Sequence, residues 1–135
     1  MAVSRFEAHV RPRFLADQSS PADGVYAFAY TIRITNTGNQ AAQLIARHWV
    51  VRDARGRVQE VRGLGVVGQQ PLLQPGETFE YTSGCQLQTA SGSMQGSYLC
   101  VSSEGETFDC PVAAFVLDAM AQDDADAPPH DRVLH

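Results

Sequence analysis

The stretch that most constrains the fold is GVYAFAYTIRITNTG, residues 24–38, in which bulky apolar side chains occupy every second position. The side chains in this phase are those of Tyr26, Phe28, Tyr30, Ile32 and Ile34. A period of two over this length is typical of a β-strand with one buried face. The following NTGN, residues 36–39, supplies the residues of a turn, so the pattern predicts a strand that ends in a reversal of the chain.

Further segments of the same kind follow at intervals of about ten residues, and no stretch has the 3.6-residue period of an amphipathic helix. They are AQLIARHWVVRD (42–53), RVQEVRG (57–63), ETFEYTS (77–83), GSMQGSYLCVSS (92–103) and ETFDCPVAAFVL (106–117). In the first of them, Ile45, Arg47, Trp49 and Val51 fall opposite Leu44, Ala46, His48 and Val50. Gly96 predicts a bulge or a close backbone approach, and Pro111 predicts a break or an edge position.

Seven or so short antiparallel strands predict an all-β fold, a sandwich or a barrel. Trp49 on a central strand, with Tyr98 and Cys100 on a later one, favours an immunoglobulin-like sandwich. Three cysteines without a C-x-x-C pair argue against disulfides and against structural zinc, so we expect buried thiols.

The chain of 135 residues is expected to hold one sandwich domain, residues 1–117. Residues 118–135 form an acidic, Pro- and Ala-rich tail, expected to be flexible except where the closing RVLH packs. The N-terminus has no apolar export segment and no run is long enough to span a membrane, which predicts a cytoplasmic protein. Because much of the formal net charge of −5 lies in that tail, the nearly neutral body predicts no nucleic-acid partner.

Residues 63–68, GLGVVG, match the G-x-G-x-x-G pattern of dinucleotide-binding turns. That fold needs a helix opening at the third glycine, and Pro71 would interrupt one. An acidic residue should also follow about 20 positions on, where this chain has Ser83 and Gly84. The preceding RVQEVR alternates, unlike a buried parallel strand. The motif is therefore not a Rossmann turn.

Two interpretations of these glycines stay open. In the first, they turn the chain between the sheets while Val66 and Val67 pack into the core. In the second, the amides around Gly63, Gly65 and Gly68, flanked by Arg62, form a nest for phosphate or for a nucleotide pyrophosphate. These four residues are the candidate ligand-binding residues of the sequence.

No motif indicates catalysis: the chain has no G-x-S-x-G elbow, and the Ser83–Cys85 corner has no basic residue beside it. His48 lies within a strand and is expected to be packed or interfacial. His130 and His135 in the tail could bind a divalent metal only weakly. We expect no catalytic residues, no metal site and no cofactor.

Residues 47–100, followed by EGETFDCPVAAFVL, closely resemble the ApaG family of small bacterial proteins. The motifs that carry the resemblance are R-x-W (Arg47, Trp49), E-V-x-G-x-G-V-V-G-x-Q-P (Glu60 to Pro71), P-G-E-x-F-x-Y-x-S-G (Pro75 to Gly84) and G-x-M-x-G-x-Y (Gly92 to Tyr98). The chain departs from the family at Cys110-Pro111 and in a longer acidic linker, 118–129.

The resemblance implies a fibronectin type III-like β-sandwich and, through related domains of eukaryotic F-box proteins, a protein-interaction module. It also implies an association with cobalt and magnesium resistance, and it supplies no catalytic residues. The resulting hypothesis is a non-enzymatic module that binds an unidentified protein partner and can self-associate. The alternative is a phosphate or nucleotide-pyrophosphate sensor that uses the Gly63–Gly68 loop.

Overall fold

The alternating segment forms β2 (Tyr26–Asn36), the central strand of a three-stranded antiparallel sheet. In this sheet, β1 (Phe6–Phe14) and β6 (Thr78–Leu87) flank β2. The structure is a computed structural model that describes residues 1–120. The bulky side chains of β2 point inward, where Ile32 and Ile34 are fully buried, so the alternation placed the buried face of this strand correctly.

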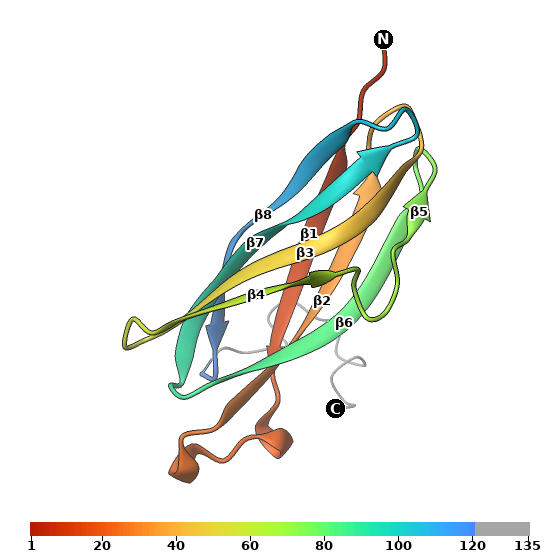
Figure 1. The fold of residues 1–135 in the computed structure, drawn as a ribbon. Helices are drawn as coiled ribbons and strands as arrows, with labels where there is room; N and C mark the ends of the chain where they lie inside the picture. The colour runs from red at the N-terminus through yellow and green to blue at the C-terminus, as the bar shows by residue number, and fades with distance from the viewer. Residues whose placement is uncertain (121–135) are drawn as a thin grey trace.

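The second sheet lies in front of the first in Figure 1, where β3 crosses over β1 and β2. Its order is β4-β3-β7-β8, and the two-residue β5 pairs with β3 beyond the end of β4. The strands are β3 (Ala42–Asp53), β4 (Val58–Leu64), β5 (Leu72–Leu73), β7 (Ser91–Ser102) and β8 (Thr107–Asp118). Two 3₁₀ turns, η1 (Ala16–Gln18) and η2 (Pro21–Asp23), join β1 to β2.

The predicted sandwich of antiparallel strands is confirmed, with seven long strands and the short β5. Cys85, Cys100 and Cys110 are all free thiols, so the sandwich contains no disulfide. The described part of the chain has no helix long and apolar enough to cross a membrane. β8 ends at Asp118, and the predictions for the tail beyond residue 120 lie outside the described residues.

An aromatic cluster centred on Trp49 joins the two sheets. The Trp49 ring meets Tyr98, its neighbour in the larger sheet, edge-on at 5.7 Å between centroids, and meets Tyr30 of the smaller sheet at 5.8 Å. Edge-to-face pairs at such distances are favourable beyond the area that they bury. Trp49 on a central strand therefore organises the core, as the sequence indicated.

The predicted faces of β3 are wrong before residue 46, because the strand has a bulge at Ile45. The alternation placed Leu44 opposite Trp49, yet Leu44 pairs with the buried Cys100 and is itself fully buried. The register shifts between Leu44 and Ala46, so Ile45 is an extra residue and the two sides of the bulge keep different phases. A simple period of two cannot contain such an insertion.

The predictions for Gly96 and Pro111 are confirmed. The β7–β8 register shifts between Met94 and Gly96, and a Cβ on Gly96 would lie 2.0 Å from the His48 carbonyl oxygen. Pro111 lies in β8, an edge strand, where a missing N–H leaves no ladder bond unmade on the free side.

Candidate functional site

The glycine loop, residues 63–71, leaves the end of β4 as a tight hairpin of its own. Val66 and Gln69 exchange two backbone hydrogen bonds, N to O, at 2.8 and 2.9 Å. Between them Val67 has φ 43° and Gly68 has φ 80°. Two successive positive φ angles in a two-residue turn match a type I′ hairpin. No helix follows the third glycine, so the structure agrees that this is not a Rossmann turn.

Arg47 holds the base of this loop. It lies opposite Tyr98 on β7, on the inner side of the sheet, and opposite Gly63 on β4. Its Nη1 donates to the carbonyl oxygens of Leu64 (3.0 Å) and Gly65 (2.8 Å). A Cβ on Gly63 would lie 2.8–2.9 Å from the guanidinium atoms. Gly63 therefore makes room for Arg47, and the loop carbonyls converge on its charge.

The sequence contains one indication that Arg47 has a structural role. Arg47 shares the phase of Trp49 and Val51 in the alternating pattern, so a charged residue occurs on the core-facing side of a strand. Arg47 is half-buried, and a cation partly removed from water needs hydrogen-bond acceptors. The backbone of the glycine motif supplies two of them.

The four predicted ligand-binding residues do not converge on one point. The Gly65 amide donates to the Ile45 carbonyl oxygen at 2.7 Å, so one of the proposed amide donors already has an acceptor. Gly68 occupies the tip of the turn with open space around its Cα. Arg62 is exposed on the outer face of β4, with its Nη2 3.4 Å from Glu60 Oε2.

The expectation that both valines of the motif pack into the core is wrong for one of them. Val66 is buried, but Val67 is 53% exposed and has a left-handed backbone. A β-branched side chain rarely adopts that conformation, because it crowds the neighbouring backbone. Val67 is thus an apolar side chain held in strain at an exposed tip.

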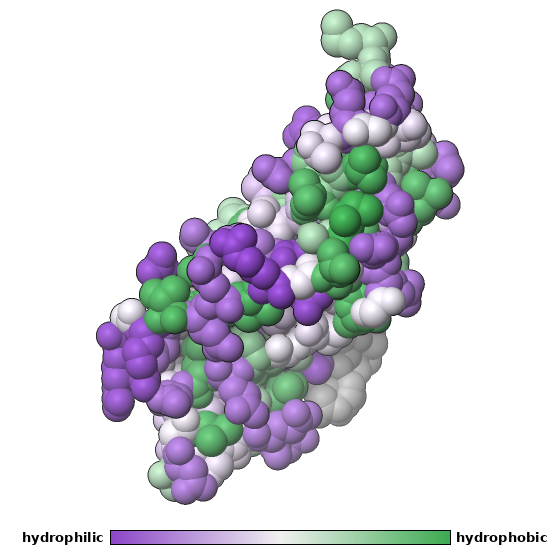
Figure 2. Space-filling view, in the orientation of Figure 1, coloured by the Kyte–Doolittle hydropathy of each residue, from purple (hydrophilic) through white to green (hydrophobic). Residues whose placement is uncertain are grey.

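Exposed leucines lie on the outer face of the larger sheet, two of them on the strands at either end of the glycine loop. Leu64 is 74% exposed, Leu72 58% and Leu99 42%. Ala46 lies between Leu64 on β4 and Leu99 on β7 in the register, so these side chains share one row. We call Leu64, Val67, Leu72 and Leu99 the apolar patch. Figure 2 shows hydrophobic side chains gathered over this part of the face, beside strongly hydrophilic ones.

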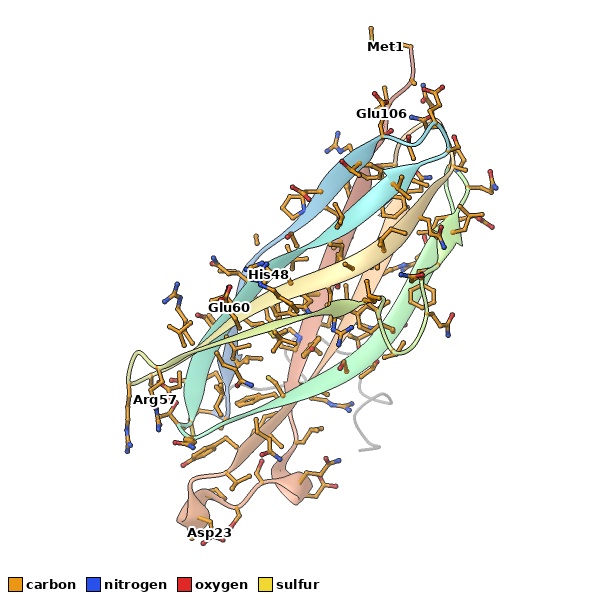
Figure 3. All side chains as sticks on the ribbon, in the orientation of Figure 1. Met1, Asp23, His48, Arg57, Glu60 and Glu106 are labelled. Atoms are coloured by element: carbon orange, nitrogen blue, oxygen red, sulfur yellow. The ribbon has the colours of Figure 1, made fainter. Side chains whose placement is uncertain are left out.

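The hydrophilic row next to the patch contains a hydrogen-bonded pair of side chains, His48 and Glu60. His48 Nε2 lies 2.7 Å from Glu60 Oε2, and both side chains lie on the open face of the sheet (Figure 3). The hydrogen bond from His48, with the charge of Arg62, lowers the pKa of the Glu60 carboxyl below its usual range. The Glu60 carboxylate is thus favoured in its ionised form.

A shallow hollow of about 320 Å³ adjoins His48 where the bulge separates β7 from β8. It is lined by His48, Val50, Gln95, Gly96, Ser97, Val112, Ala113 and Ala114. Ser97 is the cross-strand neighbour of His48, but no hydrogen bond joins them among the described residues. The His48–Glu60 pair therefore lacks the bonded nucleophile that triad chemistry requires.

The thiols are poor nucleophiles as well. Burial raises the pKa of Cys85 to about 11, of Cys100 to about 12 and of Cys110 to about 11, so all three stay protonated near neutral pH. In residues 1–120, no three His, Cys, Asp or Glu side chains group to hold a metal ion.

Known proteins resemble this chain in both sequence and fold. The model of the ApaG domain matches residues 16–102. Protein ApaG of Acidovorax sp. (strain JS42) is 60% identical over 129 residues, which is 96% of this chain and 94% of that protein. Protein ApaG of Bordetella pertussis is 61% identical over 108 residues, 80% of this chain and 82% of the relative.

A solved structure agrees with these matches. The crystal structure of the putative ApaA protein from Bordetella pertussis has a TM-score of 0.86 and 55% identity. The similarity covers 88% of this chain and 97% of that one.

Proposed function

The chain belongs to the ApaG family, and on that basis we propose that it is a non-enzymatic binding module that docks an apolar segment of a partner protein. The observation that carries the proposal is the apolar patch on the outer face of the larger sheet. Contiguous apolar side chains on a water-facing surface, rimmed by polar residues, mark protein-interaction sites. We also propose that the sandwich is of the immunoglobulin-like, fibronectin type III-like class.

The patch is preorganised, which favours binding over a fluctuating surface. Arg47 fixes the loop through two carbonyl oxygens, and the Val66–Gln69 hairpin fixes its tip. Strain retained at an exposed residue is a reason to look for function there. Val67 supplies that strain, and its side chain adds to the patch.

The hollow beside His48 extends the same face. Its lining includes Gly96, Ser97, Ala113 and Ala114, whose side chains are small or absent, and it adjoins the row that carries Leu99. A bulky partner side chain could enter it while the rest of the segment covers the patch. Well-packed central anchors of this kind dominate the energy of protein interfaces.

We infer a cytoplasmic location, because all three cysteines are free. We propose that the association with cobalt and magnesium resistance, which the resemblance to the ApaG family implies, acts through the partner protein.

The test compares capture of partners from native lysate by three forms of the protein. They are the wild type, the double variant Leu64→Ser/Leu72→Ser, and the control Val58→Ser/Val116→Ser. The control removes two exposed apolar side chains, 51% and 64% exposed, from the far end of the same face. We expect the wild type and the control to capture the same proteins in equal amounts. The patch variant should capture at least tenfold less of them.

Equal capture by the patch variant, or capture by none of the forms, would overturn the proposal. Sedimentation of the purified wild type is run beside it. If the patch variant abolishes a dimer and changes nothing else, the occupant is a second copy and the partner assignment is wrong.

The phosphate-sensor alternative is decided by backbone amide shifts of Gly63, Gly65 and Gly68 during titration with ATP, diadenosine tetraphosphate and pyrophosphate. The Gly65 amide already donates to Ile45, so binding there would have to break that bond. Saturable shifts at all three glycines would favour the sensor over the docking module.

A further inference from the structure

The outer face of the smaller sheet gathers three arginines that lie apart in the sequence. In the β1–β2 register Arg11 is opposite Thr31, Arg13 is opposite Ala29, and Arg33 is opposite His9. Residues that pair in this way share a face, and alternate residues along a strand share it too. Arg11, Arg13 and Arg33 are all exposed, and we call them the arginine face.

Within residues 1–120 no carboxylate forms an ion pair with these three guanidinium groups. Glu7 lies on the same face, but it pairs with Arg5 at 2.8 Å. Glu80 faces Arg33 across the β2–β6 register without a salt bridge to it. The described surface therefore has an excess of positive charge here, with three arginines outside any ion pair against Glu80, in a chain whose formal net charge is −5.

The side chains beside these arginines are small. Thr31 and Thr82 join their hydroxyls at 2.8 Å across β2 and β6. The row of Arg13 continues into Ala29 and Gly84, which have little or no side chain. An extended chain could lie on this floor between the long arginine side chains without meeting a bulky obstacle.

We propose that the arginine face binds an acidic, extended segment of a partner protein with carboxylates at alternate positions. Arg11 and Arg13 are two residues apart on one strand, a spacing of about 6.8 Å. Alternate side chains of an extended peptide repeat at the same spacing. Each guanidinium can take a carboxylate through two parallel N–H···O bonds, which fixes register as well as attraction.

The composition of the face favours a peptide over a nucleic acid. By the register of β1, β2 and β6, the residues that share this face include no Phe, Tyr or Trp on which a base could stack, and His9 is the one aromatic ring among them. Glu7 and Glu80 on the same face would repel a continuous phosphate backbone, whereas a peptide can place a neutral or basic residue beside them.

This inference is independent of the docking proposal, because the arginine face and the apolar patch lie on opposite sides of the sandwich (Figure 1). A domain with both surfaces could bridge two partner segments. A negative result in one test therefore does not contradict the other proposal.

The experiment measures binding of a ten-residue peptide of alternating Glu and Thr to the full chain by calorimetry at low and at 0.15 M salt. The variant is Arg11→Thr/Arg13→Thr. The matched control is Arg52→Thr/Arg55→Thr, which removes two exposed arginines from the end of β3 and the turn that follows it. The same peptide with Gln in place of Glu, and a single-stranded oligonucleotide of equal charge, are the comparison ligands.

We expect saturable binding by the wild type, at least tenfold weaker binding by the face variant and a change below twofold for the control. The Gln peptide should not bind, and affinity should fall with salt. Equal weakening of both variants would overturn the proposal, since it would reflect net charge alone, and so would tighter binding of the oligonucleotide or no saturation at millimolar peptide.

One further arm tests the identity of the occupant. Asp123, Asp124 and Asp126 of this chain are replaced together by Asn. A tenfold gain in peptide affinity would overturn the partner assignment, because the chain's own acidic segment would then be the occupant. Unchanged affinity supports an external acidic partner.

Discussion

The phenolic oxygens of Tyr81 on β6 and Tyr98 on β7 lie 2.6 Å apart and join the two sheets through a buried hydrogen bond. Tyr98 is fully buried and Tyr81 is nearly so. Burial raises the pKa of both phenols above the usual value, so each remains a neutral donor and acceptor. Each hydroxyl is the partner that the other needs in the core.

This pairing predicts non-additive losses of stability. Tyr98→Phe should lower the free energy of unfolding by about 1–3 kcal/mol, because it leaves the Tyr81 hydroxyl without a partner. Tyr81→Phe should cost a similar amount. The double variant should lose clearly less than the sum, since no polar group is then left unpaired. Urea unfolding of the four proteins measures the cycle, and strict additivity would contradict the coupling.

Arg47 and Gly63 should show a second coupling. A methyl at Gly63 would lie 2.8–2.9 Å from the guanidinium and would push it off the carbonyl oxygens of Leu64 and Gly65. We expect Gly63→Ala to lower the free energy of unfolding by about 1 kcal/mol in a background with Arg47, because it weakens two hydrogen bonds that the guanidinium makes at a partly exposed site. In the Arg47→Met background the added cost should be much smaller. The Arg47→Met background is the control for loss of a glycine alone, because the guanidinium that the methyl would meet is then absent.

The three thiols make stability fall at alkaline pH. Their folded pKa values are raised to about 11 or 12, whereas thiols of the unfolded chain ionise near 9. Between these values the unfolded state binds fewer protons, so the free energy of unfolding decreases as pH rises, by up to about 1.4 kcal/mol per pH unit for each thiol.

Cys110→Ala tests that slope. Measured by urea unfolding with reductant between pH 9 and 10.5, the variant should show a shallower dependence on pH than the wild type. Val112→Ala, a truncation of a buried neighbour on β8, should lower stability without changing the slope. Identical slopes for Cys110→Ala and the wild type would show that this thiol does not hold its proton in the fold.

The sandwich was predictable because its strands are marked locally. The period of two in β2 needs no partner strand to be recognised, and Gly96 and Pro111 mark the β7–β8 bulge and the edge strand by their own chemistry. The prediction of which side chains face the core was wrong where pairing with a second strand sets the register. The bulge at Ile45 returns Leu44 to the core through its pairing with Cys100, and nothing within β3 alone indicates that insertion.

The candidate sites depended on register in the same way. The glycine motif drew attention to amides, whereas the structure shows its carbonyls bound to Arg47. The arginines of β1 and β2 are unremarkable along the chain and meet only because Val10 pairs with Ile32 and the flanking residues follow. In the sequence, Leu99 alternates with Tyr98 and Cys100, so it falls on the side of the strand that faces water. A leucine on that side is the signal that could have indicated the patch.

Val67 separates stability from function in a single substitution. Val67→Asn should raise the free energy of unfolding by about 1 kcal/mol, because asparagine tolerates positive φ and Asn-Gly is the preferred pair for this turn. The same change should weaken capture of the partner, since it removes an apolar side chain from the patch. Urea unfolding and the lysate capture measure the two effects on one protein. Val58→Asn, an exposed valine in regular strand conformation, should give no gain in stability. A Val67→Asn protein that is no more stable would show that the backbone is not strained, and one that captures the partner fully would remove Val67 from the binding surface.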